Sequence, residues 1–268
     1  MKYLIKLEYL FLITFQSVCM CSIGNAQIVN FDTKNGAVEI SADDGIEWQQ
    51  ESFVFIAKGN AKAVRENLEV KARELRAYYK KLKNGSTEVI RLDAISDITI
   101  VSDEYTAYGD HAIYDMDSKI ITMTGKKLKL VAKDDWLSAR DQLEFWEKKQ
   151  MAVARGNAMA LRGDRKIYAN VLAAYFKKTK REGSKIYRVD AFENVKIITN
   201  KDEATSDRGV YNVESGIATL TGSVKIKRGT NVLQGCSAQV NLNTGISQLN
   251  RCPSGKKRVR GSVVTKTK

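Results

Sequence analysis

The sequence predicts an all-β fold built from a tandem duplication of about 97 residues. The segments "IAKGNAKAVRE" (56–66) and "VARGNAMALRG" (153–163) are near copies at this spacing, and "AYYKKLKNGSTEVIRLDA" (77–94) recurs as "AYFKKTKREGSKIYRVDA" (174–191). Apolar and polar residues alternate within both copies, as they do in half-buried strands. The triplets KNG, DDG and NTG mark turns between these runs, and the single proline, Pro253, leaves the strands uninterrupted. Together these features indicate a β-sandwich, jelly roll or barrel.

A helix is the alternative for residues 63–82, which are rich in helix formers and carry apolar residues at nearly helical spacing. In the second copy, Arg165 stands at the position of Leu68, so the apolar stripe of that helix is broken. Alternation survives in both copies, because Val70 and Ala72 match Ile167 and Ala169 with one polar or aromatic residue between them. We therefore expect strands in both copies.

The repeat continues beyond two copies and contains one irregularity. Between Gly125 and Ala139 the two copies slip by one residue relative to each other, and we expect a β-bulge there. The start of a third copy is indicated by anchors that recur at the same spacing: Ala42, Ile46 and Trp48, then Ala139, Leu143 and Phe145, then Cys236, Val240 and Leu242.

Residues 1–26 have the pattern of a secretory signal peptide. Lys2 and Lys6 precede an apolar run that ends in the small residues of "GNA" at 24–26, so we expect a mature, exported chain that begins near Gln27. An uncleaved membrane anchor is the alternative, but the run is short and is interrupted by Gln16. We expect one β-domain over 27–250 and a flexible basic tail over 251–268.

The sequence offers little for catalysis or metal binding. One histidine, His111, cannot complete a Ser/His/Asp set, and the acidic pairs 43–44 and 134–135 lie in turns and differ between the copies. We therefore expect no enzyme activity, no metal site and no cofactor. In an exported chain Cys236 and Cys252, on either side of an expected hairpin at 243–245, are expected to form a disulfide, with free thiols as the alternative.

The segments "EISADDGIEW" (39–48) and "VFIAKGNAKAVRENLEVKARELRAYY" (54–79) resemble the OstA-like family of periplasmic lipopolysaccharide transport proteins, to which LptA belongs. A tyrosine strand, a Gly-containing turn and an alternating strand recur around Gly59, Gly125, Gly156 and Gly222, so that the resemblance covers nearly all of 37–250. It implies an elongated, twisted β-jellyroll that carries lipopolysaccharide across the periplasm in an apolar groove, as part of a bridge between the inner and outer membranes.

An apolar groove has a physical purpose for such a cargo. Moving one methylene out of water is favourable by about 0.8 kcal/mol, so a lipid with several acyl chains needs shielding in an aqueous compartment. A closed, fully packed sandwich would show the same alternation and is the alternative. The residues that we expect to line the groove are Ile46, Trp48, Leu68, Val70, Ile98, Ile100, Leu143, Phe145, Ile167, Val195, Ile197, Val224, Ile226, Val240 and Leu242.

The net charge of +13 favours anionic partners. For an exported protein, the phosphates of lipid A are a better match than nucleic acid, because the sequence shows neither a recognition helix nor an aromatic stacking platform. Arg65, Arg91, Arg162 and Arg188 recur in pairs and are candidates for a phosphate-binding rim, although solvated charges on a strand face are the alternative.

The resemblance also implies protein partners. An LptC-like inner-membrane protein would pair with the N-terminal sheet edge near 37–48, an LptD-like outer-membrane protein would pair with the C-terminal edge near 240–250, and copies of the chain could join head to tail. An adhesin or another structural repeat protein without lipid cargo is the competing interpretation. A β-helix is disfavoured because its rungs repeat every 20–25 residues or so, far below the period found here.

Overall fold

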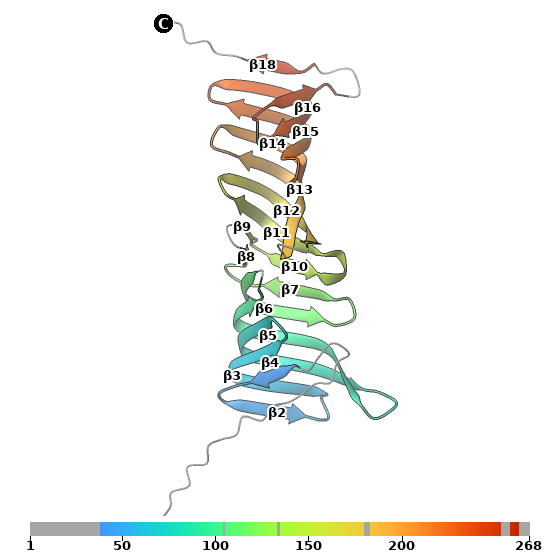
Figure 1. Ribbon diagram of the computed structural model, residues 1–268. Coiled ribbons are helices and arrows are strands. Elements are labelled where there is room, and N and C mark those ends of the chain that lie inside the picture. Colours follow the sequence, from blue (N-terminus) through green and yellow to red (C-terminus); the bar gives the residue numbers. More distant parts are fainter. Residues whose placement is uncertain (1–37, 104, 133–134, 180–182, 253–257, 263–268) are drawn as a thin grey trace, which may run out of the picture.

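A computed structural model describes residues 38–103, 105–132, 135–179, 183–252 and 258–262. The predicted signal peptide therefore lies outside the described residues. In the described ranges there is no helix of sufficient length and apolar character to cross a bilayer. The strands lie across the long axis of an elongated molecule, and the chain climbs in sequence order from β2 at one end to β18 at the other (Figure 1). The architecture is an elongated, twisted β-jellyroll.

The elements alternate along the chain with short turns. They are β1 (Glu39–Ser41), β2 (Gly45–Gln49), β3 (Val54–Arg65), β4 (Leu68–Lys81), β5 (Thr87–Val101), β6 (Thr106–Asp115), β7 (Ile120–Thr124), β8 (Lys129–Ala132), β9 (Asp135–Ser138), β10 (Gln142–Trp146), the 3₁₀ turn η1 (Glu147–Lys149), β11 (Met151–Arg162), β12 (Arg165–Thr179), β13 (Gly183–Ile198), β14 (Asp202–Asn212), β15 (Ile217–Arg228), β16 (Asn231–Asn241), β17 (Ser247–Asn250) and β18 (Arg260–Ser262).

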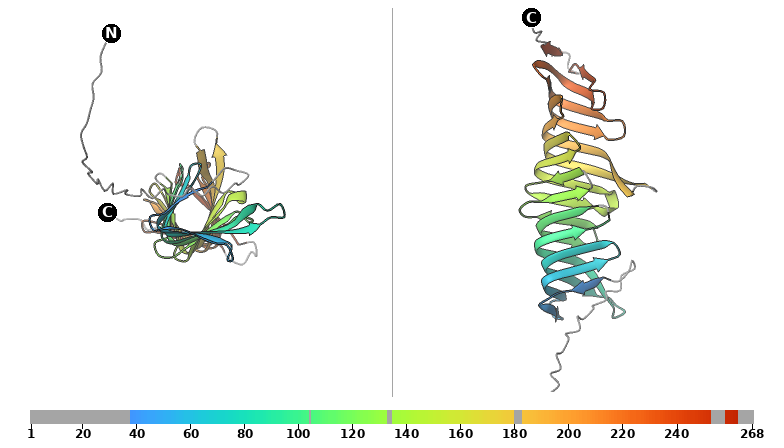
Figure 2. Two further views of the ribbon diagram at one scale, coloured as in Figure 1. Left: turned by 90° about the horizontal axis from the view of Figure 1, so that it is seen from below. Right: turned by 60° about the vertical axis from the view of Figure 1, so that its left-hand side comes forward.

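Each long strand pairs antiparallel with the next and is interrupted near its middle, so that its two halves belong to two facing layers. We call the line of interruptions the spine; the register shifts there at 58–61, 71–74, 95–98, 155–158, 168–171, 192–195, 205–208 and 221–224. Where a strand is split into separate elements, as in β1 and β2, the gap falls on the same line. Seen end-on, the strands surround a central axis (Figure 2).

The two layers are named here by the turns that end them. Arm A runs from the spine to the turns at 66–67, 163–164, 199–201 and 229–230, and arm B runs from the spine to those at 50–53, 82–86, 116–119, 147–150, 213–216 and 242–246. We call the side opposite the spine, where the ends of arms A and B face each other, the seam. The arms are staggered, because the arm A end of β12 contacts β14 and the turn after β16.

Glycine and aspartate form the recurring unit of the spine. Gly156 has a φ of +82°, and a Cβ built on it would overlap the carboxylate of Asp141. The same relation holds for Gly59 with Asp44, for Gly125 with Asp110 and for Gly222 with Asp207. Glycine is needed because only it tolerates both the positive φ and the approach of the carboxylate. Asp44 of the "DDG" segment recurs in the second copy as Asp141. Both aspartates thus have a packing role against a glycine of the spine.

The predicted strands and the repeat are confirmed, including the strand over 68–81 for which a helix was the alternative. The expected irregularity is also present. Between β7 and β8, the six residues 124–129 lie opposite the four residues 108–111 of β6. In the second copy, the five residues 221–225 lie opposite the four residues 205–208 of β14. The extra residue of the first copy accounts for the slip of the repeat.

The C-terminal tail is not wholly separate from the jellyroll. We expected a flexible segment over 251–268, but Arg260–Ser262 forms β18, which pairs with Val232–Gln234 of β16. The basic composition of this segment gave no alternation from which a strand could be predicted. Backbone pairing does not require apolar side chains, so a strand forms there all the same. The remaining residues of the tail, apart from 251–252 and 258–259, lie outside the described ranges.

The structure joins Cys236 of β16 to Cys252 by a disulfide, with the two Cα atoms 5.0 Å apart. The bond holds the end of the last hairpin, where β17 pairs only with β16 among the described residues. Replacing both cysteines by serine is expected to lower the free energy of unfolding by about 3 kcal/mol, because the closed loop of 16 residues regains its freedom in the unfolded chain.

Urea unfolding and amide hydrogen exchange would measure this effect. Exchange should rise first in β17, since it is held by only four residue pairs with β16 and the disulfide ties the chain just after it. The oxidised wild type treated with a reductant serves as the control and should behave as the double variant does. Equal stability of both proteins would show that the hairpin needs no covalent tie.

Candidate ligand-binding interior

Three apolar cavities lie in a row between the arms. Their volumes are about 100, 70 and 60 Å³ in order from the N-terminal end. Neighbouring cavities share lining residues: Ile100 and Ile121 border the first and second, while Leu130 and Phe176 border the second and third. The cavities therefore follow one path along the long axis, from β1 to the turn after β16.

Large apolar side chains cover this path on the seam side. We call the following partly buried residues, all of which pack on the buried core and line a cavity, the seam row: Leu68, Met116, Ile121, Leu130, Phe145, Phe176, Ile186, Val213 and Leu242. They come from both arms, near the turns. Phe145 and Phe176 meet edge to face, with ring centroids 6.2 Å apart.

The burial of the inner side chains changes from the spine to the seam. Beside the spine the inner positions are fully buried, both small ones such as Ala61 and Ala158 and large ones such as Ile98 and Leu172. Nearer the turns the inner leucine, isoleucine and phenylalanine side chains are only partly buried. Because interiors are filled to nearly crystalline density, this gradient indicates that the arms are closer at the spine than at the seam. The partly buried side chains of the seam row border the remaining space.

The volume of the cavities limits what they hold in this conformation. A dry protein cavity of roughly 150 Å³ holds one benzene molecule, and the first of these three cavities, at about 100 Å³, is smaller than that. An acyl chain therefore enters only if the seam row moves or the arms part. Partly buried side chains are the ones that can move without disturbing the fully buried core.

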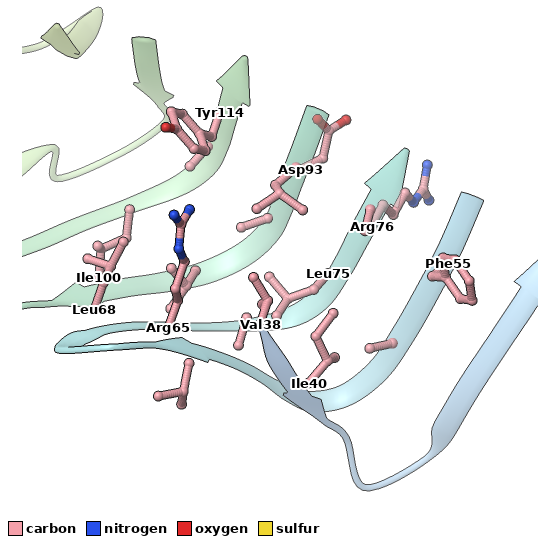
Figure 3. A pocket seen from close by; sticks show the side chains of 18 of the residues that line it. Val38, Ile40, Phe55, Arg65, Leu68, Leu75, Arg76, Asp93, Ile100 and Tyr114 are labelled. Carbon is pink, nitrogen blue, oxygen red and sulfur yellow. The ribbon is translucent and has the colours of Figure 1, made fainter. Parts of the chain in front are cut away.

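The seam of the first repeat is polar at its outer margin. Arg65, at the arm A end of β3, Tyr114 and Glu147 line the first cavity. The Tyr114 hydroxyl donates a hydrogen bond of 2.9 Å to Glu147 Oε1. Burial, and then this bond, raise the pKa of Tyr114, whereas Arg65 lowers it. Figure 3 shows Arg65 directed toward the side of the pocket where Tyr114 lies.

The seam of the second repeat is closed by different residues. Arg165, at the start of β12 in arm A, donates to three groups of arm B: from Nη1 to Tyr211 Oη at 2.8 Å, and from Nη2 to Asn243 Oδ1 at 3.0 Å and to the Leu242 carbonyl oxygen at 3.3 Å. It also lines the third cavity. This side chain spans the seam directly above an apolar space.

The fifteen predicted groove residues divide into three groups. Eight line a cavity: Ile46, Leu68, Val70, Ile100, Leu143, Phe145, Ile167 and Leu242. Six belong to the closed core, with at most 4% of their surface exposed: Ile98, Val195, Ile197, Val224, Ile226 and Val240. Ile98, Val195 and Val224 directly follow a register shift, where the arms are too close to leave a gap.

Trp48, the fifteenth, is 55% exposed and is not part of a covered groove. Its exposure arises because β2 pairs only with β3 among the described residues, so no further strand covers it. Its ring stacks on Phe55 at 5.2 Å, and its indole N–H donates to Tyr79 Oη at 2.7 Å. Trp48 thus marks the N-terminal end of the apolar path.

The four predicted rim arginines do not form one rim. Arg91 and Arg188 make paired hydrogen bonds to Asp93 and Asp190, and these bonds raise the pKa of each arginine. Arg91 is next in sequence to Leu92, which points inward, and successive side chains of a strand point to opposite faces. Arg91, and Arg188 at the equivalent position, therefore lie on the outer face. Arg65 and Arg162 line cavities at the seam, with Arg162 Nη1 3.8 Å from Asp135 Oδ2.

Sequence reasoning missed several residues of the interior. Phe176 lies in the repeated phrase at 174–191 and shares the inward parity of Leu172 and Ala174, so the signal was present but was not used. The inward direction of Ile186, by contrast, depends on a bulge at Tyr187, which alternation alone does not show. Arg165 was noted only as a mismatch to Leu68. Its partners are 46 to 78 residues away in sequence, so no local signal identifies the contact.

A family model, one curated protein and one solved structure are similar to the chain. The family model described as "LptA/(LptD N-terminal domain) LPS transport protein" matches residues 39–140 and again 139–246, which are close to the two copies of the repeat. An uncharacterized protein of Rhizobium meliloti (strain 1021) is 26% identical over 117 residues, which is 42% of this chain and 63% of that protein's length. A crystal structure of LptH from Pseudomonas aeruginosa, described as the LptA-homologous periplasmic component of the lipopolysaccharide transport device, matches with a TM-score of 0.38 at 14% identity, over 57% of this chain and 99% of that one.

Proposed function

Because the chain belongs to the LptA/LptD N-terminal domain family of lipopolysaccharide transport proteins, which matches it over 39–246, we propose that it is a periplasmic carrier that shields the acyl chains of lipopolysaccharide between the inner and outer membranes. The carrier binds lipid A in the interior of the jellyroll. It performs no chemical reaction, and the direction of transport is imposed by other components of the machinery.

One observation carries this proposal above the others: the cavities form a single apolar path under a seam row of partly buried side chains. A sandwich built only for stability would be filled to the same density throughout, since each unfilled space loses packing energy. Here the side chains beside the spine are fully buried, and the space lies next to the partly buried side chains of the seam row, which can move. An acyl chain that replaces them regains the lost contacts.

The energy of acyl burial is sufficient for such a carrier. At about 0.8 kcal/mol for each methylene, a chain of ten methylenes gains roughly 8 kcal/mol when it is removed from water. Parting the arms costs the packing energy of the seam row. This cost is smaller than that of opening a fully buried core, because the seam-row side chains are already partly exposed. The net balance favours uptake while leaving release possible when a neighbouring protein offers a similar path.

The proposal includes protein partners at the two ends. In the described residues, β2 pairs only with β3, and β17 pairs only with β16, so each end of the jellyroll presents an unpaired strand edge. An LptC-like protein at β2, an LptD-like protein at β17, or further copies of the chain would extend the sheet by backbone pairing. Trp48 and Phe55 lie where the apolar path would continue into the neighbour.

Photo-crosslinking tests the proposal. With p-benzoylphenylalanine at Leu68 or at Phe145, radiolabelled lipopolysaccharide is expected to form adducts, because both side chains line cavities on the seam side. The matched control is Tyr108, which lies on the outer face of β6 and is 42% exposed. It reports the adducts that arise from lipid bound anywhere on the surface.

The result to expect is a strong adduct at 68 and 145 and a weak one at 108. Equal labelling at all three positions would indicate surface association of the lipid with a basic protein. Absence of adducts at 68 and 145 in folded protein would contradict the carrier and favour a structural role without lipid cargo.

A further inference from the structure

Among the described residues, no carboxylate makes an ion pair with Arg165 at the seam; Asp135, which lines the same cavity, faces Arg162 instead. The three acceptors of Arg165, Tyr211 Oη, Asn243 Oδ1 and the Leu242 carbonyl, are all uncharged. By contrast, Arg91, Arg155 and Arg228 each place Nε 2.5–2.6 Å from a carboxylate oxygen.

The two repeats differ in charge at this place. At the repeat spacing of 97 residues, Arg165 corresponds to Leu68, Tyr211 to Tyr114 and Thr244 to Glu147. Around the same tyrosine, the second repeat therefore has a basic residue where the first has leucine, and threonine where the first has an acidic residue. Both differences make the seam of the second repeat more attractive to an anion than that of the first.

The position of Arg165 relates this charge to the apolar path. The residue lines the third cavity together with Ile167, Phe176 and Leu242, and its guanidinium bridges the two arms at the outer margin of that cavity. A ligand with an apolar chain in the cavity would have its head at the guanidinium. Arginine binds phosphate through two parallel N–H donors, and such charge-assisted bonds are stronger than bonds to neutral oxygens.

From these contacts we infer that Arg165 is a headgroup site for a phosphate-bearing amphiphile. We call the three hydrogen bonds from Arg165 to arm B the latch, because before a ligand binds they hold the two arms of the second repeat together. This inference rests on the proposed carrier function and adds a residue and a chemical class to it. A phosphate at the seam takes the Nη2 donor from Asn243 and the Leu242 carbonyl. The bonds that join the arms are then released as the chain enters.

Two detergents with the same chain test the inference: dodecyl phosphate and dodecyl maltoside, each below its critical micelle concentration and at 0.15 M salt. Isothermal titration calorimetry of the full chain is expected to show about tenfold tighter binding of the phosphate, the factor that one charge-assisted hydrogen bond supplies. In Arg165→Met the phosphate should bind no more tightly than the maltoside. Arg165→Lys should keep part of the preference.

The matched control is Lys166→Met. Lys166 is exposed and follows Arg165 on the same strand, where alternation directs it to the opposite face. It removes the same formal charge from the same strand and should leave the preference unchanged. Loss of the preference in both variants would assign it to the general charge of the protein and overturn the inference.

The latch has a separate readout in the rate of binding. Asn243→Ala keeps the guanidinium but removes one bond across the seam, so dodecyl maltoside should bind a few-fold faster in stopped-flow measurements. An unchanged rate would show that Arg165 does not hold the arms. Equal affinity of the wild type for both detergents would refute the headgroup site alone, whereas failure to bind either detergent would contradict the carrier function itself.

Discussion

Replacing Leu130 with glutamate is expected to weaken the binding of a lipid chain at least a hundredfold while the protein remains folded. Leu130 lines both the second and the third cavity, so a chain that follows the axial path passes it. A carboxylate beside an alkyl chain must lose water or protonate, and either costs several kcal/mol. Leu130 is only partly buried, so in the empty protein the new carboxylate can reach solvent, and the cost to folding is smaller.

Titration of dodecyl maltoside and of lipopolysaccharide measures the loss, and far-UV circular dichroism reports the fold. Tyr108→Glu is the matched control, because Tyr108 lies opposite Lys129, the neighbour of Leu130, and is exposed on the outer face. It adds the same charge to the adjoining strand outside the interior. Leu130→Met, which keeps volume and apolarity, should bind normally. Wild-type binding by Leu130→Glu would show that lipid does not pass between these two cavities.

The alternation that predicted the strands also explains why part of the sequence imitates a helix. In β4 the inward residues are Leu68, Val70 and Ala72 before the spine, and Leu75, Ala77 and Tyr79 after it. The step from Ala72 to Leu75 is three residues, because the register shifts between Lys71 and Glu74. A period of two with one step of three approximates helical spacing over this length. Comparison of the two copies resolved the ambiguity, since both must fit one structure.

The sequence could show which residues face inward but not which of them border space. Ile98 and Ile100 are two residues apart on one face of β5, and both are nearly fully buried. Only Ile100 lines cavities. The difference arises from distance to the spine, which depends on how two layers diverge and not on the residue itself. Contacts across the seam are still less accessible to sequence reasoning, because they join segments that the stagger of the arms brings together.

The duplication has also been used differently in its two halves. Positions that hold the spine are kept, as shown by the glycine and aspartate pairs that recur at the repeat spacing. Positions at the seam have diverged, as shown by Leu68 and Arg165. This distribution is expected if the spine maintains the fold while the seam meets the ligand, because a change at the seam alters binding without removing a turn or a bulge.

The spine gives the largest expected effect on stability. Gly156→Ala is expected to lower the free energy of unfolding by about 4 kcal/mol. A φ of +82° costs an alanine about 1–2 kcal/mol, and the overlap of its Cβ with Asp141 adds about 1–3 kcal/mol more, comparable to overpacking of a core. Asp141 cannot move away freely, because both of its carboxylate oxygens accept hydrogen bonds from Arg140 and its backbone N–H donates to the Arg155 carbonyl.

Gly163→Ala separates the two costs. Gly163 also has a positive φ, +56°, but a Cβ there would meet no atom within 4 Å, so we expect a loss of about 1 kcal/mol from backbone strain alone. In the double variant Asp141→Ala/Gly156→Ala the overlap is removed, and urea unfolding should show that the two changes together cost less than the sum of the single changes. If Gly156→Ala and Gly163→Ala are equally stable, the carboxylate yields readily. The spine would then derive its rigidity from the strand ladders and not from the glycine and aspartate pairs.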